Sequence, residues 1–233
     1  MDDQCFNSPF FSICIPQYNR TSFLIEACKS LLCQTFTDFE VCISDDCSTD
    51  GRESELLAFL EQSGLSFVYH RQNHNTRYDG NLRSAISLAR GRYCFLLGND
   101  DSLASPNTLA ELHAEMCRYG SVSAVLTNYA EDANGVLYAR VQRGGNLGSG
   151  PDVAVRYFRN FSFVSGIILD RVKAQQHATL HWDGSEMYQM FIGCRMIAEG
   201  GSLIGIDRVV IRKDIQVPGE SVDSYISKKT PDL

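Results

Sequence analysis

The sequence has no apolar run that approaches the roughly 20 residues a membrane-spanning helix needs. Its start, MDDQCFNSPF, is acidic and lacks the positive first segment and apolar core of a signal peptide. Basic residues are also in deficit: the formal net charge is −7, whereas a nucleic-acid binder usually needs a basic face to meet phosphates. We therefore expect a cytoplasmic chain with no nucleic-acid partner and at most a peripheral contact with the inner face of the membrane.

Closely spaced cysteine pairs are absent as well. There are nine cysteines but no Cys-x-x-Cys pair, the arrangement that most often supplies zinc ligands. Several cysteines lie within apolar runs, among them Cys14, Cys42 and Cys94. Buried free cysteine behaves as a small hydrophobic side chain, so the pattern favours reduced thiols over a zinc site or a disulfide scaffold.

The 233 residues are 44% hydrophobic and 21% charged, which is typical of a folded α/β domain. In the first 130 residues, short apolar runs that predict buried strands alternate with amphipathic segments that predict helices. We expect strands at Phe10–Ile15, Phe39–Ser44, Ser66–His70 and Tyr93–Leu97. Helices are expected from Thr21 or Ser22, at Glu53–Ser63, at Asn81–Arg90 and from Ser105 to Gly120. Repeated βα units predict a mostly parallel sheet with helices on both faces.

The second half is less regular. It predicts strands at Ala124–Thr127 and Ser162–Leu169, a hairpin turn at Asn134-Gly135, a helix at Ser185–Glu199 and paired strands within Ser202–Arg212. The glycine-rich stretch Arg143–Gly150 is interpreted as a flexible loop and a candidate lid, and the residues from Lys213 as a polar tail.

Two pairs of aspartates follow predicted strands. Asp100 and Asp101 come directly after Tyr-Cys-Phe-Leu-Leu, and Asp45 and Asp46 follow the strand one βα unit earlier. Ligands of parallel sheets bind beyond the carboxyl ends of the strands. Adjacent carboxylates suit Mg²⁺ or Mn²⁺, and an ionised aspartate can accept a hydrogen bond from a nucleobase N–H. Aspartate is also common in turns, so the alternative is an ordinary loop.

A longer set of residues resembles glycosyltransferase family 2. It comprises Ser12–Arg20 (SICIPQYNR), Ser30–Phe36, Phe39–Asp50, Asn75, Gly80-Asn81, Ala89–Tyr93 and Asp100-Asp101. The likeness covers roughly residues 10–110 with consistent order and spacing. It implies the GT-A fold, which is a Rossmann-like α/β fold with a mixed, mostly parallel sheet flanked by helices. It also implies a nucleotide-diphosphate sugar donor, a Mn²⁺ or Mg²⁺ ion, and inversion at the anomeric carbon.

The resemblance also implies roles for individual residues. Pro16, Tyr18 and Asn19 would line the nucleoside pocket, and Asp46 would hold the base. Asp100 would contact the ribose or support the metal site, and Asp101 would bind the metal. Arg77 and Asn81 lie where the family often places donor contacts. One departure is that many members carry aspartate at the position of Gly98, which leaves this chain with a two-carboxylate version.

The general base is expected from the second half, where the family places an acidic residue at the start of a helix. The stretch Trp182–Gln189 offers Glu186 as the first choice and Asp183 as the second, because a helix N-terminus favours an ionised carboxylate. An alternative is a capping box in which both side chains bind backbone N–H groups. The Asp-Gly-Ser-Glu-x-Tyr-Gln run is also similar to bacterial O-antigen transferases such as the abequosyltransferases.

These observations predict a single GT-A domain over residues 1–233, with a nucleotide-sugar-binding half at about 10–127, an acceptor-side half at about 128–212 and a tail at 213–233. The expected activity is transfer of a sugar to a saccharide or lipid-linked saccharide in bacterial surface-polysaccharide synthesis. The alternative is a non-catalytic relic of the same fold that binds nucleotide sugar or carbohydrate. A nicotinamide dehydrogenase would need a glycine-rich first βα turn, which Pro16–Arg20 does not supply. The sequence leaves a homo-oligomer open.

Overall fold

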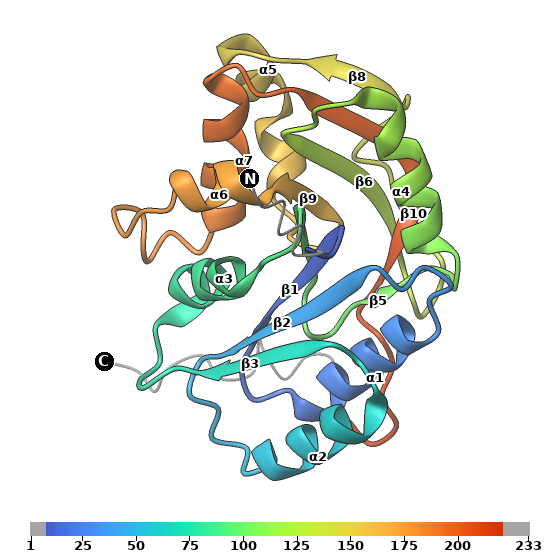
Figure 1. The fold of residues 1–233 in the computed structure, drawn as a ribbon, viewed down its shortest axis with the longest axis vertical. Helices are drawn as coiled ribbons and strands as arrows, with labels where there is room; N and C mark the ends of the chain where they lie inside the picture. Colours follow the sequence, from blue (N-terminus) through green and yellow to red (C-terminus); the bar gives the residue numbers. More distant parts are fainter. Residues whose placement is uncertain (1–7, 221–233) are drawn as a thin grey trace, which may run out of the picture.

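The computed structural model describes residues 8–220 as one ten-stranded sheet with helices on both faces (Figure 1). The strand order is β3-β2-β1-β4-β9-β6-β10-β5, with β7 paired to β6 and β8 paired to β10. Most neighbours along this path are parallel, and β9 runs antiparallel between β4 and β6. The mixed, mostly parallel α/β sheet expected from the sequence is therefore confirmed.

The first half alternates strands and helices as expected. Its elements are β1 (Phe11–Gln17), α1 (Thr21–Leu32), β2 (Phe39–Asp45), α2 (Glu53–Ser63), β3 (Phe67–Arg71), α3 (Arg77–Leu88) and β4 (Tyr93–Leu96). The strands β3, β2, β1 and β4 are all parallel, so their carboxyl ends meet at one edge. This edge carries both aspartate pairs.

The second half completes the sheet and covers its other end. Its elements are β5 (Ser102–Leu103), α4 (Thr108–Met116), β6 (Ala124–Glu131), β7 (Leu137–Tyr138), β8 (Gly145–Gly148), α5 (Pro151–Tyr157), β9 (Ile167–Asp170), α6 (Arg171–Gln176), α7 (Tyr188–Ala198) and β10 (Leu203–Lys213). The hairpin expected at Asn134-Gly135 is confirmed as the β6–β7 connection, and Gly135 there has a left-handed φ of 71°.

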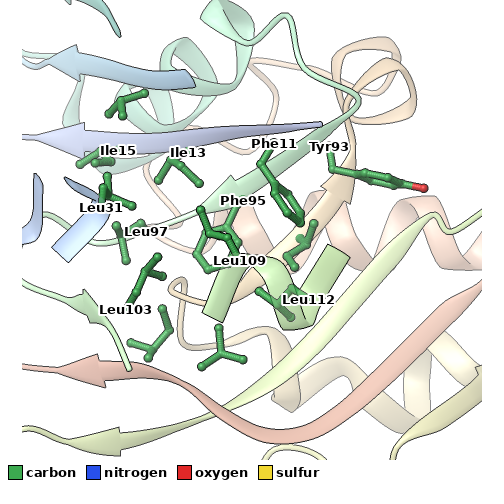
Figure 2. Packing of buried hydrophobic residues seen from close by; sticks show 14 of the residues in the cluster. Phe11, Ile13, Ile15, Leu31, Tyr93, Phe95, Leu97, Leu103, Leu109 and Leu112 are labelled. Carbon is green, nitrogen blue, oxygen red and sulfur yellow. The ribbon is translucent and has the colours of Figure 1, made fainter. Parts of the chain in front are cut away.

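Two hydrophobic clusters hold the helices to the two faces of the sheet. Alternate residues of β1 point to opposite faces, as the pleat of a strand requires. Ile13 and Ile15 pack with α1, α2 and α4, and Figure 2 shows Ile13 and Ile15 in the same cluster as Leu109 and Leu112 of α4. Cys14 faces the other way, with α3, α5, α6 and α7. Each fully buried side chain of this size contributes about 1.5–3 kcal/mol.

The cysteines expected inside the fold are buried and free. Cys14 lies opposite Cys42 in the β1–β2 register, and Cys94 is buried on β4. Burial raises the pKa of the Cys14 thiol well above its ordinary value. Among residues 8–220, no helix is both long and apolar enough to span a membrane.

Several predicted boundaries are wrong. The helix expected from Asn81 begins at Arg77, because Gly80 and polar neighbours hide its first turn from an apolar pattern. The strand expected at Ser162–Leu169 is confined to Ile167–Asp170, and a 3₁₀ turn at Phe158–Phe161 comes before it. The segment Ser202–Arg212 forms one strand, β10, rather than a pair.

The predicted lid at Arg143–Gly150 is also wrong. Its central residues form β8, which pairs antiparallel with the start of β10. The glycines allow an irregular edge strand, since Gly145 and Gly148 take φ values of 132° and 107°. The segment is therefore part of the sheet.

Candidate active site

A cavity of about 570 Å³ opens at the carboxyl ends of the parallel strands. Its walls come from the ends of β1 and β2, the segment after β4, the start of α3, the segment before α7 and the residue after β10. Seven of the ten predicted site residues line it: Pro16, Tyr18, Asp46, Arg77, Asn81, Asp100 and Glu186. The other three, Asn19, Asp101 and Asp183, lie outside its lining.

The two aspartates at the end of β2 have different surroundings. Asp46 lines the cavity, and its Oδ1 accepts hydrogen bonds from the backbone N–H of Thr76 at 2.6 Å and from the Thr76 hydroxyl at 2.8 Å. Asp45 accepts from Ser48 N at 2.7 Å and from the Tyr69 hydroxyl at 2.9 Å. Asp45 therefore fixes the local loop, whereas Asp46 ties the start of α3 to the cavity wall.

Asn19 shapes the cavity from behind. It has a left-handed φ of 49°, and its N–H donates to the Ser48 hydroxyl at 2.9 Å. Its Oδ1 accepts from Thr49 N at 2.5 Å, which joins the end of β1 to the end of β2. Asn81 lies on the cavity wall and donates through Nδ2 to the Gln17 carbonyl at 3.0 Å.

Asp100 and Asp101 face in different directions. Asp100 lines the cavity and forms an ion pair with the buried Arg20, and burial raises its pKa despite that partner. Asp101 is 2% exposed and accepts from the Ser165 hydroxyl and from Asp214 N. Burial, followed by the charge of Asp100, raises the pKa of Asp101 to about 7.

Asp214 is a cavity residue that the sequence did not indicate. It lies directly after β10, at the start of the predicted polar tail, with a left-handed φ of 56°. Its N–H donates to Asp101 Oδ1 at 3.0 Å, and Ile215 N donates to the Asp100 carbonyl at 2.9 Å. Ile215 itself packs against Phe23 and Ala27 of α1. Asp214 is thus the one residue of the described part of the tail that lines the cavity, and residues 221–233 lie outside the described range.

The donor set suits a hard divalent cation. Asp100 and Asp214 both line the cavity, and Asp101 lies next to them, where its carboxylate accepts a hydrogen bond from Asp214 N. Burial together with neighbouring carboxylates raises the pKa of Asp100 and Asp101, and a divalent cation would relieve that repulsion. Within residues 8–220, no three Asp, Glu, His or Cys side chains gather closely enough to form a metal cage. A cation held by one or two carboxylates would complete its shell from phosphates and water, as Mg²⁺ commonly does.

Gly98, where the resemblance leads us to expect aspartate in many related chains, lies in a closed space. A Cβ at this position would be 2.9 Å from Asp101 Oδ2 and 3.2 Å from both Asp100 Oδ1 and Ser165 Oγ. The Gly98 N–H donates to Ser165 Oγ at 2.7 Å. Asp101 and Ser165 therefore occupy the volume that a side chain at position 98 would need.

The acidic residues of the predicted base region form separate ion pairs. Glu186 lines the cavity, has a left-handed φ of 58°, and accepts from Arg77 Nη2 at 2.6 Å. Asp183 pairs with Arg83 of α3, with 2.8 Å between Arg83 Nη2 and Asp183 Oδ2. The predicted helix start at Ser185 is wrong, because α7 begins at Tyr188. The capping-box alternative is wrong too, since no side chain from its own N-cap caps this helix.

The group that does bind these N–H groups is Asp79, on the first turn of α3, which the sequence did not single out. Its Oδ2 accepts from Gly184 N at 2.9 Å and Glu186 N at 2.8 Å, and its Oδ1 accepts from Tyr188 N at 3.0 Å. The side chain is 1% exposed.

Comparison with known proteins agrees with this geometry. The solved structures of TarS residues 1–349 from S. aureus with UDP and of the mannosyltransferase PcManGT from Pyrobaculum calidifontis with GDP-Man and Mn²⁺ share the fold. TarS gives a TM-score of 0.71 at 18% identity over 88% of this chain and 60% of that one. PcManGT gives 0.64 at 17% identity over 91% and 59%. The fold is therefore that of GT-A enzymes.

The sequence comparisons identify the family. The model of Glycosyl transferase family 2 matches residues 12–181, so this chain belongs to that family. It is 40% identical over 95 residues to abequosyltransferase RfbV of Salmonella typhimurium, which is 40% of this chain and 28% of that protein. It is 32% identical over 144 residues to a PGL/p-HBAD biosynthesis glycosyltransferase of Mycobacterium tuberculosis, a match that covers 57% of this chain and 56% of that protein. The matched regions thus span about a quarter to just over half of these relatives.

Proposed function

We propose that this chain is an inverting glycosyltransferase that moves a sugar from a nucleotide-diphosphate donor to a hydroxyl group of a saccharide or lipid-linked saccharide. One observation carries the proposal: a single cavity brings together Asp46 after β2, Asp100 after β4, Arg77 from α3 and Glu186 before α7. Its volume of about 570 Å³ lies within the usual range of ligand pockets. The relatives support the same class of donor, since TarS was solved with UDP-GlcNAc and PcManGT with GDP-Man.

The donor's nucleoside would lie at the β1–β2 end of the cavity. Tyr18 supplies an aromatic face there, and the Asp46 carboxylate can accept a hydrogen bond from a base N–H. Pro16 and Asn81 complete the wall, and Asn19 holds the loop behind it. Asp45, which is bound to Ser48 and Tyr69, keeps this end rigid.

The donor's diphosphate would lie toward Asp100, where we propose that Mn²⁺ or Mg²⁺ binds. Asp100 would contact the ribose or the ion, and Asp101 would take part in holding the ion, with Asp214 as a further oxygen ligand from the cavity wall. A divalent ion bound there supplies positive charge that stabilises the leaving diphosphate without a proton donor.

On the acceptor side, Glu186 is proposed as the general base. Attack of the acceptor oxygen forms the new bond to the anomeric carbon while the bond to the diphosphate oxygen breaks and its electron pair leaves with the diphosphate. The hydroxyl proton passes to the Glu186 carboxylate. Arg77 donates to that carboxylate at 2.6 Å, and a guanidinium on the cavity wall is suited to bind phosphate oxygens of the proposed donor. Asp183, bound to Arg83 outside the cavity, is the second choice of base.

The finer assignments follow from the resemblance to RfbV. We propose an acceptor in bacterial surface-polysaccharide synthesis, as in O-antigen assembly, and a cytoplasmic location with peripheral contact at the inner face of the membrane. The net charge of −7 supports the absence of a nucleic-acid partner. Self-association into a homo-oligomer is compatible with this proposal.

The test has two stages. A thermal-shift panel of UDP-, GDP-, CDP- and dTDP-sugars, each with and without Mn²⁺, should show a metal-dependent rise for one nucleotide, because a ligand that binds only the folded state stabilises it. Slow release of nucleoside diphosphate from that donor, with water as acceptor, then measures turnover. The Glu186→Gln variant should keep the thermal shift and lose roughly 10²–10⁴-fold in turnover.

The results also decide between an enzyme and the non-catalytic relic, the alternative that the resemblance leaves because glycine stands at position 98. A shift without any turnover would support the relic. Full turnover by the Glu186→Gln variant would move the base to Asp183 or elsewhere, and no shift with any donor would refute nucleotide-sugar binding.

A further inference from the structure

The helix α3 holds the loop that carries Glu186 through several independent contacts. Arg77 and Arg83 pair with Glu186 and Asp183, and the Tyr78 hydroxyl donates to Gln189 Oε1 at 2.9 Å. Arg83 also donates to the Thr179 carbonyl at 3.0 Å. A helix of the donor-side half therefore binds one segment about 100 residues further along the chain.

Asp79 makes the most extensive of these contacts. Its two carboxylate oxygens accept from three backbone N–H groups of the loop, those of Gly184, Glu186 and Tyr188, at 2.8–3.0 Å. The Ser185 hydroxyl lies at 3.4 Å from the same carboxylate. Hydrogen bonds to an ionised acceptor are roughly twice as strong as neutral ones, and this carboxylate is withdrawn from water.

These bonds explain an unfavourable backbone conformation. Glu186 has a φ of 58°, in the left-handed region, which costs a non-glycine residue about 1–3 kcal/mol and persists only where the surroundings impose it. The Glu186 N–H is bound by Asp79, and so are the N–H groups two residues before and two residues after it. The same carboxylate lies at the N-terminus of α7, where negative charge is stabilising.

We infer that Asp79 is the positioning residue of this site: it fixes the Gly184–Tyr188 loop so that the Glu186 carboxylate faces the cavity. This inference rests on the proposed function in so far as Glu186 is the base. Asp79 does not line the cavity. It should therefore affect turnover rather than donor binding, which depends on Asp46 and Tyr18 at the other end.

The test compares Asp79→Asn with a matched control, Asp170→Asn. Asp170 also accepts a backbone bond at a helix start, from Lys173 N at 3.0 Å, but it lies away from the cavity. Asparagine keeps the size of Asp79 while one of its two acceptors becomes an N–H₂ group that cannot accept. We expect Asp79→Asn to lower the kcat of donor hydrolysis about 100-fold, the order of loss that a misplaced catalytic group causes, with KM for the donor within about threefold. Asp170→Asn should change neither.

A second measurement does not depend on activity. Hydrogen–deuterium exchange of the 184–188 peptide should be slow in the unmodified chain, because three of its amides are bound to Asp79, and should speed up at least tenfold in Asp79→Asn. Fast exchange in the unmodified chain would overturn the inference even if the variant does not fold. Unchanged kcat in Asp79→Asn, or equal losses of kcat and donor affinity, would overturn it too.

The two proposals can fail separately. If Glu186→Gln keeps full turnover, the base assignment fails, while the exchange experiment still decides whether Asp79 holds the loop. If Glu186→Gln is inactive and Asp79→Asn is fully active, Asp79 has no positioning role and the base assignment stands.

Discussion

Adding a side chain at Gly98 tests whether this chain has closed the space where many relatives keep a third carboxylate. The backbone of Gly98 is not among the left-handed glycines, so any cost comes from the added atoms. An alanine Cβ would approach Asp101 Oδ2 to 2.9 Å and both Asp100 Oδ1 and Ser165 Oγ to 3.2 Å. These atoms can shift only by disturbing the Gly98–Ser165–Asp101 hydrogen bonds.

The expected loss of free energy of unfolding has a steric contribution and, for an added aspartate, a charge contribution. Overpacking a closed site costs roughly 1–3 kcal/mol, so Gly98→Ala should lower the free energy of unfolding by that amount. Gly98→Asp adds a third negative charge. Two charges at ~4 Å repel by about 4 kcal/mol at an effective dielectric constant of 20, and uptake of a proton would relieve part of this. We therefore expect a total loss of roughly 3–5 kcal/mol for the aspartate variant at pH 8 without a divalent cation.

Urea denaturation of the two variants and the unmodified chain, with EDTA and with Mn²⁺, separates the two parts. The difference between the aspartate and alanine variants should shrink with Mn²⁺, because the cation screens charge, and the alanine cost should not. An alanine variant as stable as the unmodified chain would refute the closed-space interpretation. Equal stability of the two variants in EDTA at pH 8 would refute the charge argument.

Two further predictions concern charged side chains that each have several hydrogen-bond partners. Glu40 is 1% exposed and accepts hydrogen bonds from the Ser12 hydroxyl and from the backbone and guanidinium of Arg90. Burial acts to raise its pKa, but these bonds prevail and lower the pKa below its ordinary value. Glu40→Gln should therefore lower the free energy of unfolding, measured by urea denaturation, by roughly 2–3 kcal/mol near pH 7. The difference from the unmodified chain should narrow as the pH falls through the lowered pKa of Glu40, because the stabilising ionised form is then lost. A difference that grows toward low pH would contradict this reasoning. Arg140 donates to three backbone carbonyls of β6 and the 163–165 segment, and burial lowers its pKa to about 10. Arg140→Met leaves those carbonyls without a donor and should cost roughly 2–4 kcal/mol in the same assay, and a loss below 1 kcal/mol would show that water replaces the guanidinium.

The sequence predicted the strands and helices of the first half well because their signals are local. A buried strand followed by a pair of aspartates can be recognised within ten residues of sequence. The strands β1, β2 and β4 are parallel, so the polar residues that follow them lie at one edge of the sheet, as expected. The same reasoning could not separate Asp100 from Asp101. Asp100 lines the cavity, whereas Asp101 binds the Ser165 hydroxyl and the Asp214 N–H. Both partners of Asp101 come from segments far along the chain.

The acceptor-side half was less predictable, since its conformation depends on long-range contacts. The helix start at Ser185 was expected from an acidic residue and an apolar period, yet the backbone there is held in a non-helical shape by Asp79, 105 to 109 residues earlier. The glycine-rich stretch was interpreted as a lid because glycine favours flexibility, whereas pairing with β10 orders it. Neither Asp79 nor β10 lies close enough in the sequence to the segment it holds for a local pattern to indicate the contact.

The placement of α3 gives the two halves of the site a physical connection. Its first turn begins at Arg77, where the Asp46–Thr76 bonds tie it to the nucleoside end of the cavity. Two residues later Asp79 binds the loop that carries Glu186. If the proposed donor binds at Asp46, a movement of that turn would reach the loop of Glu186 through the hydrogen bonds of Asp79. Exchange of the second half between relatives would therefore preserve the strands and still misplace Glu186, the proposed base, unless the residues of α3 that bind the loop were exchanged with it.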